Sequence, residues 1–210
     1  MKKFNEASQK NYLVPSSRIS NNSYCSSYFV AQNLLFNIGS TAGVGHEQSD
    51  NFDVNVTSIP GAQGGNKHVI SQGPSLCLLS HPEDGKEMRT ARIRAAWQFY
   101  DFITSPENSA NWALTVGYLP VRLSSLETEK YLDYADPTGK TSRSLELLNA
   151  KNAQYSTQAS NNVFTSPVFK GSSTARSQVG ALMSAVMNNA NPNYDALFES
   201  AVNEIKKDMN

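Results

Sequence analysis

The side chains best suited to meet a polar ligand lie in small-residue loops that follow apolar runs. Ser40 and Thr41 come directly after the run that ends at Ile38, and they precede Gly43. Hydroxyls and free backbone N–H groups in such a loop can donate hydrogen bonds to a polar ligand. The same two residues would serve as plain caps of a preceding strand, so their spacing leaves both a binding role and a capping role open.

A glycine and an arginine offer further contacts of this kind. Gly73 interrupts a strand-like apolar run in SQGPSLCLL, where a β-bulge is the simple structural explanation. Arg176 stands near Ser172 and Ser173, and its planar guanidinium suits a phosphate or two neighbouring sugar hydroxyls. Helix capping or a surface ion pair would explain Arg176 nearly as well.

No catalytic or metal-binding motif accompanies these residues. The chain contains no GxSxG, no phosphate-binding Gly-Lys-Ser/Thr loop and no HExxH. His46, His68 and His81 are far apart, without a second ligand at metal spacing. We therefore predict no catalytic residue, no metal and no cofactor. The alternatives are an enzyme of unfamiliar type that uses Tyr118, Arg176 and an acid, or a structural surface domain.

Composition narrows the class of partner. Lys and Arg total 18, as do Asp and Glu, so the neutral chain offers nucleic acid or an anionic membrane no electrostatic attraction. The first ten residues lack the apolar run of a signal peptide, and no stretch reaches the ~20 apolar residues of a membrane span. Cys25 and Cys77 lack metal-site spacing. We expect two unpaired, largely buried thiols, although a single disulfide stays open.

The elements that must position these residues change from strands to helices along the chain. Strands are expected at residues 33–38, 52–56, 68–71 and 75–79, of which the second has strictly alternating apolar residues. Helices are expected at residues 26–32, 93–103, 106–117, 124–134, 141–152, 179–186 and 194–205. Few strands and many helices predict α/β layers with an incomplete sheet, which favours a truncated chain.

Local signals mark the helix pair at residues 93–117 in more detail. Ser105 and Pro106 predict an N-cap and a first helical position, and Gly117 predicts a left-handed end. The extended residues 118–121 then form a crossover. Trp97 and Trp112 stand among alanines and aliphatic residues, so we expect both in the core.

Five stretches carry a resemblance to a known family. They are FNIGSTAG at 36–43, FDVNVTSIP at 52–60, VISQGPSLCLLS at 69–80, AAWQFYDFITSPENSANWALTVGYLPVRLSSLE at 95–127 and SPVFKGSSTARSQVGALM at 166–183. In this order they resemble the C-terminal half of the extracellular solute-binding proteins of ABC importers. The resemblance implies a partial α/β fold of periplasmic-binding-protein-like type II, a two-lobed Venus flytrap with a helix-rich C-terminal lobe.

The resemblance also implies how the chain is divided and where it works. Residues 1–37 would belong to the C-terminal lobe, 38–117 would return to the N-terminal lobe, and 118–210 would complete the C-terminal lobe, with a hinge at 118–121. The full-length parent would be a monomer, extracellular or periplasmic and membrane-anchored, whose export signal is absent from this chain. The isolated chain would bind solute weakly or not at all, since half of the cleft would be missing.

By the same resemblance the chain would be no enzyme but the substrate-binding component of an importer. It would capture a carbohydrate or a sugar or glycerol phosphate and deliver it to the transmembrane permease subunits. Ser40, Thr41, Gly73, Tyr118 and Arg176 would bind the ligand, Gly73 by allowing close backbone approach. No tryptophan stands near Val179, where maltose-binding relatives have one, which argues against a maltodextrin.

Overall fold

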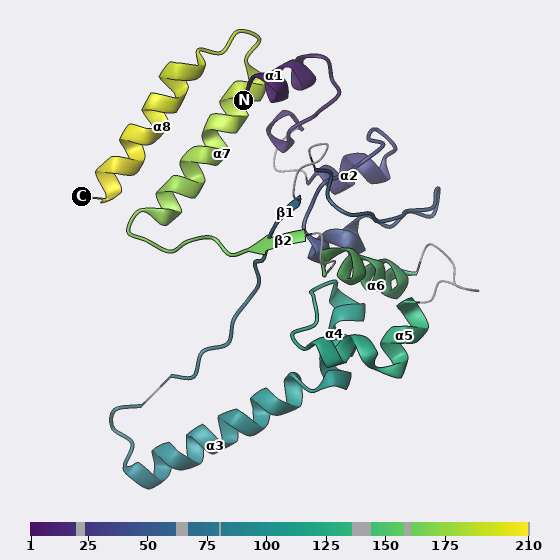
Figure 1. The fold of residues 1–210 in the computed structure, drawn as a ribbon, viewed down its shortest axis with the longest axis vertical. Coiled ribbons are helices and arrows are strands. Elements are labelled where there is room, and N and C mark those ends of the chain that lie inside the picture. The colour runs from purple at the N-terminus through teal and green to yellow at the C-terminus, as the bar shows by residue number, and fades with distance from the viewer. Residues whose placement is uncertain (20–23, 62–66, 80, 136–143, 158–160, 210) are drawn as a thin grey trace. The chain divides into compact units, whose positions relative to one another are not determined.

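The computed structural model describes residues 1–19, 24–61, 67–79, 81–135, 144–157 and 161–209 (Figure 1). The chain consists of two compact units. Unit 1 contains residues 1–28 and 166–210, and unit 2 contains residues 29–165. The lobe boundaries expected from the sequence, 1–37, 38–117 and 118–210, come from the family resemblance and not from contacts within the chain. They stay a prediction.

Helices dominate both units. Unit 1 contains α1 (Lys2–Gln9), the 3-10 turn η1 (Ser16–Arg18), the start of α2 (Cys25–Val30), α7 (Ser172–Asn188) and α8 (Tyr194–Met209). Unit 2 contains η2 (Thr41–His46), β1 (Lys67–Ile70), α3 (Lys86–Ile103), α4 (Pro106–Val116), η3 (Leu123–Glu127), α5 (Glu129–Ala135), α6 (Leu145–Ser156) and β2 (Asn161–Phe164). The described chain is therefore helix-rich with few strands.

In unit 1, α7 and α8 lie side by side and α1 packs against the end of α7 (Figure 1). The last carbonyls of a helix have no partner within the helix. The Asn5 amide supplies one, because Nδ2 donates to Val186 O and to Asn189 O, each at 2.7 Å. Asn5 is only 6% exposed, so this buried amide fixes α1 to the C-terminus of α7.

Unit 2 is built around α6. One apolar cluster joins α6 to α4 and α5 and consists of Ala110, Leu114, Tyr131, Ala150 and Ala153. A second cluster joins α6 to η2 and to the extended chain at 52–56, and it consists of Val44, Val54 and Leu148. Since both clusters use α6, this helix fixes the positions of η2 and of the end of α4.

The sheet is smaller than the sequence predicts. β1 pairs with β2 in parallel, with Lys67 opposite Asn161 and Ile70 opposite Phe164, which confirms the strand expected at 68–71. Residues 33–38, 52–56 and 75–79 are described and form no strand, so those predictions were wrong. A strand needs a partner in register, and β-propensity alone does not supply one.

The alternating segment shows how a strand pattern can persist without a sheet. Val54 is buried, Phe52 and Val56 are half-buried, and the polar residues between them are exposed. Phe52 packs edge-to-face on Phe29, with ring centroids 5.4 Å apart. The period of two in the sequence therefore buries one face of an extended chain against the helices.

The local signals around α4 are confirmed. The Ser105 hydroxyl caps the helix by accepting the Asn108 N–H at 3.3 Å, and Pro106 occupies the first turn. Gly117 ends the helix with φ of 76°. These features depend on neighbouring residues alone, so the sequence could predict them.

Two predictions about burial were wrong. Trp97 is 68% exposed and Trp112 is 59% exposed, because no described residue covers the outer faces of α3 and α4. Both cysteines are free as expected, but Cys25 is half-buried and Cys77 is exposed rather than buried. Helical spacing identifies an apolar stripe but does not identify what covers it.

Candidate ligand-binding site

Ser40 and Thr41 begin the short turn η2. The Ser40 Oγ accepts the Ala42 N–H at 3.3 Å, and the Ser40 carbonyl accepts the Gly43 N–H at 2.9 Å. Ser40 therefore caps the turn that follows it, and not the preceding strand expected from the sequence, because residues 33–38 form no strand. A serine hydroxyl that accepts one bond can still donate another, and Ser40 is exposed, so capping and ligand binding are compatible.

The end of α4 touches this loop at Gly117. A Cβ on Gly117 would lie 2.7 Å from the Thr41 carbonyl oxygen and 3.4 Å from the Ala42 Cα. Tyr118 follows directly and is 37% exposed. The structure thus brings together the segments that carry Ser40, Thr41 and Tyr118, which are widely separated in sequence. We call this place the loop junction.

Asn149 of α6 lies under the loop junction and was not identified from the sequence. Its Nδ2 donates to the Leu114 carbonyl at 2.6 Å, which satisfies one of the last carbonyls of α4. Its Oδ1 lies 2.8 Å from the position of a Gly117 Cβ. The only available signal was an amide within the otherwise apolar helical stretch LLNA. Asn149 therefore fixes the C-terminal end of α4 against α6.

A half-buried carboxylate, that of Glu47, lies at the end of η2. Asn37 Nδ2 donates to Glu47 Oε1 at 2.6 Å. Burial raises the pKa of Glu47, and the Asn37 hydrogen bond and the charge of His46 oppose that rise. Glu47 could accept hydrogen bonds from ligand hydroxyls, although sequence reasoning did not select it.

The two remaining candidate residues belong to other segments of the chain. Gly73 belongs to an exposed extended segment, and a Cβ added there would meet no described atom within 4 Å. Arg176 lies on α7 in unit 1 with an exposed side chain. The structure therefore brings together the segments that carry Ser40, Thr41 and Tyr118, and the ligand roles of all five candidate residues stay predictions.

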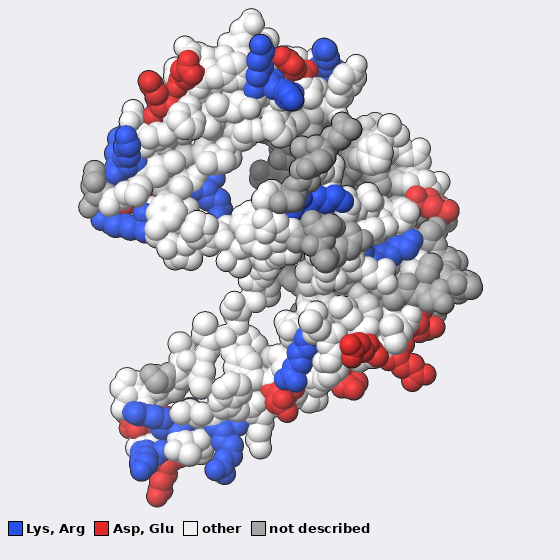
Figure 2. Space-filling view, viewed as in Figure 1, with Lys and Arg blue, Asp and Glu red and all other residues white. Residues whose placement is uncertain are grey.

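The surface carries no dominant charge. Figure 2 shows both acidic and basic side chains on the visible face, and the chain is formally neutral. Among the described residues, no cluster of three or more His, Cys, Asp or Glu side chains could hold a metal ion. Within the same residues, every helix is too short or too polar to cross a membrane.

Comparisons with known proteins point to one family. Residues 7–138 match the bacterial extracellular solute-binding proteins. The sn-glycerol-3-phosphate-binding periplasmic protein UgpB of Pectobacterium atrosepticum is 28% identical over 113 residues, which are 53% of this chain and 24% of that protein. UgpB of Yersinia enterocolitica is 28% identical over 119 residues, 56% of this chain and 26% of that protein. The match thus spans about a quarter of each relative, and no solved structure matches the chain.

Proposed function

The chain belongs to the bacterial extracellular solute-binding proteins, and from this membership we propose that it forms part of the substrate-binding component of an ABC importer. This family generally binds solutes without transforming them and implies a periplasmic-binding-protein-like fold. The observation that carries the proposal is the loop junction. The matched residues 7–138 include both of its segments, and their hydroxyls and aromatic ring suit a polar solute.

The ligand class is a carbohydrate or a sugar or glycerol phosphate. Two relatives are named for binding sn-glycerol 3-phosphate. Ser40 and Thr41 offer hydroxyls and Tyr118 offers an amphipathic ring, which together suit the hydroxyls and C–H faces of a polyol. Gly73 would admit close backbone approach, and Arg176 would bind a phosphate with its guanidinium fork.

The mechanism is closure of a two-lobed, type II receptor around the solute. A solute that contacts both lobes binds the closed form more tightly, so it shifts the population towards closure. Residues 1–37 and 118–210 would belong to one lobe and 38–117 to the other. The transmembrane permease subunits would recognise the closed form.

The setting of this receptor follows from the same proposal. The relatives are periplasmic proteins. We infer an extracellular or periplasmic location and propose that the receptor is anchored to the membrane. The complete receptor would act as a monomer.

A thermal-shift panel tests the proposal. The complete polypeptide that carries this chain is heated with sn-glycerol 3-phosphate, glucose 6-phosphate, maltose and glycerol in turn. Binding to the folded state alone at 100 times the Kd adds about 2.7 kcal/mol to the free energy of unfolding, so one of these solutes should raise the melting temperature by several degrees. Turnover of a solute, or no shift with any member of the panel, would contradict the receptor function.

A further inference from the structure

We propose that Arg122 is a positioning residue that fastens the crossover at 118–121 to the corner between α3 and α4, and so holds Tyr118 beside the Ser40–Thr41 loop. The fastening itself follows from contacts within unit 2. Its consequence for a solute rests on the proposed function, because only that function gives Tyr118 a ligand.

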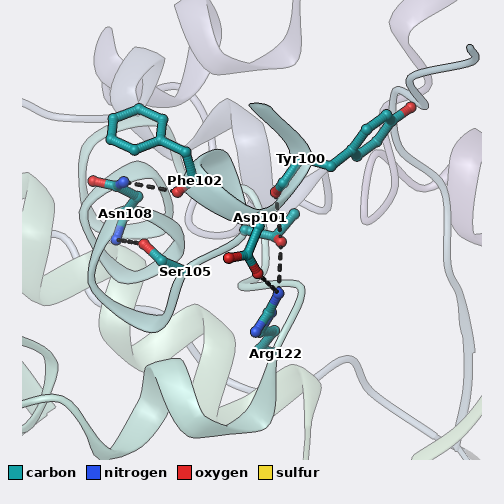
Figure 3. A network of polar contacts seen from close by, with 7 residues as sticks. Tyr100, Asp101, Phe102, Ser105, Asn108 and Arg122 are labelled. Atoms are coloured by element: carbon teal, nitrogen blue, oxygen red, sulfur yellow. Dashed lines mark hydrogen bonds and ion pairs between the residues drawn. The ribbon is translucent and has the colours of Figure 1, made fainter. Parts of the chain in front are cut away.

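The corner between α3 and α4 is internally bonded (Figure 3). Asn108 in the first turn of α4 donates from Nδ2 to the Phe102 carbonyl at 2.8 Å. Thr104 ends α3, and its Oγ1 donates to the Tyr100 carbonyl at 2.7 Å. The Tyr100 and Phe102 carbonyls also accept the Thr104 and Ser105 backbone N–H groups, at 3.0 and 3.2 Å. Each carbonyl therefore accepts two hydrogen bonds, which hold the corner between α3 and α4 together.

The crossover joins this corner at two points. Arg122 donates from Nη2 to Thr104 Oγ1 at 2.9 Å and to Asp101 Oδ1 at 3.3 Å (Figure 3). One residue earlier, the Val121 N–H donates to Ser109 Oγ at 3.1 Å, and Ser109 is only 5% exposed. A backbone donor and a side-chain donor therefore hold the same end of the crossover.

The contacts of Arg122 differ in strength. Asp101 is 82% exposed, so its ion pair with Arg122 is screened and weak. Thr104 is half-buried and its hydroxyl both donates and accepts, so the charge-assisted bond from Arg122 extends a chain of hydrogen bonds to the end of α3. A cation is also favoured at the C-terminus of a helix. Thr104 is thus the main partner.

Both ends of the crossover are then fixed. At its start, Gly117 lies against the Thr41 carbonyl and the Asn149 amide. At its end, Arg122 and Val121 are bonded to the corner. Tyr118 lies between these two anchors, so its position beside the loop depends on both.

Hydrogen exchange of the Val121 amide tests the fastening without any solute. Arg122→Met and Thr104→Val in this chain should each speed Val121 exchange by about threefold, the scale of an exposed charged pair. The double variant should exchange no faster than the single variants, because both remove the same bond. Ser109→Ala removes the acceptor of Val121 and sets the upper limit, and Arg122→Lys should restore most of the protection.

The matched control is Arg94→Met, which removes an exposed arginine of α3. It should leave Val121 exchange unchanged, and amides within α4 should exchange alike in all variants. Unchanged Val121 exchange in Arg122→Met, or an equal rise in Arg94→Met, would overturn the proposal. Because Arg122 is exposed, the melting temperature of Arg122→Met should move by no more than about 2 °C.

A second measurement separates the fastening from the proposed function. Calorimetric titration of the complete polypeptide with sn-glycerol 3-phosphate and with maltose should show a severalfold weaker affinity in Arg122→Met than in Arg94→Met. If the unmodified protein binds no solute, the receptor proposal fails and Val121 exchange alone decides the role of Arg122. If solute binds with equal affinity in both variants, the crossover is fastened but Tyr118 does not depend on it, and the positioning role is refuted.

Discussion

Gly117 ends α4 and also lies against the Ser40–Thr41 loop. Its φ of 76° lies in the left-handed region, and a Cβ there would lie 2.7 Å from the Thr41 carbonyl and 2.8 Å from Asn149 Oδ1. A left-handed conformation costs a residue other than glycine about 1–2 kcal/mol before any clash. Gly117 therefore permits both the end of α4 and the loop junction.

Replacing Gly117 gives the first prediction. Gly117→Ala should lower the free energy of unfolding by at least about 2 kcal/mol, since conformational strain and a backbone clash add together. Gly180→Ala is the matched control, because Gly180 lies within α7 and a Cβ there meets no atom within 4 Å. That control should gain about 0.5–1 kcal/mol in chemical denaturation. Equal effects of the two substitutions would refute the described junction.

Gly73 differs from Gly117 because a side chain there has open space around it. A Cβ there would meet nothing within 4 Å, so Gly73→Ala should leave the free energy of unfolding within about 0.5 kcal/mol of the parent. If the backbone at Gly73 approaches a solute closely, the same variant should bind that solute at least tenfold more weakly. Calorimetry on the complete polypeptide measures this, and unchanged affinity would remove Gly73 from the site.

Glu47 predicts a pH dependence of stability. Burial raises its pKa in the folded protein, so the folded state holds the proton more strongly than the unfolded chain does. The free energy of unfolding therefore falls as pH rises through the window between the ordinary and the raised pKa. Glu47→Gln keeps an oxygen for the Asn37 amide and removes the charge. It should stabilise the protein at pH 7 and have little effect at pH 3.

Urea denaturation at the two pH values measures this difference. Glu199→Gln, which replaces an exposed acid of α8, shows the general effect of removing one carboxylate. A Glu47→Gln variant that is less stable than the parent at pH 7 would show that the charged form is favoured, contrary to the prediction.

Residues differ in how far the sequence predicts their role. Ser105 and Gly117 act on backbone groups within four positions of themselves, so their neighbours sufficed to identify them. Asn149 and Glu47 depend on partners outside that range, Leu114 and Asn37. No local pattern encodes such pairs, which explains why the sequence did not identify Asn149 or Glu47.

At the scale of elements, the packing of α1 on α7 in unit 1 depends on the Asn5 amide. Asn5 satisfies two carbonyls at the end of α7 from a buried position. Asn5→Ala should lower the free energy of unfolding by about 2 kcal/mol, because the buried Val186 carbonyl loses its donor and the part-buried Asn189 carbonyl loses one of two. Gln9→Ala removes longer, exposed bonds to the same helix end, of 3.2 and 3.3 Å, and should cost under about 0.5 kcal/mol. Equal losses by thermal denaturation would argue against a buried anchor.

Helices were predicted better than strands for a physical reason. The hydrogen bonds of α7 and α8 lie within each helix, so neither helix needs a distant partner to form. Both occur where the spacing of apolar residues predicted them. The expected strands at 33–38 and 75–79 needed partners that the described chain does not give them. Only β1 finds such a partner, and it comes from β2, more than ninety residues along the chain.

At the scale of the molecule, α3 and the segment before it expose several large apolar side chains. Those of α3 include Met88, Trp97, Phe99 and Phe102, and those of the preceding segment include Leu76, Leu78 and Leu79. These α3 side chains point to different sides of the helix, and the described residues leave each of them largely exposed. The sequence predicted the stripe but placed Trp97 in a core, since amphipathic spacing says that a face is apolar and not what lies against it.

The central claim is that the loop junction binds a polar solute, and the most direct test is a calorimetric titration of the complete polypeptide before and after Tyr118→Ala. Tyr118 is partly exposed and its loss should cost little stability. We expect the parent to bind sn-glycerol 3-phosphate or another member of the panel, and Tyr118→Ala to bind it at least tenfold more weakly. Equal affinity in the two proteins would contradict the account.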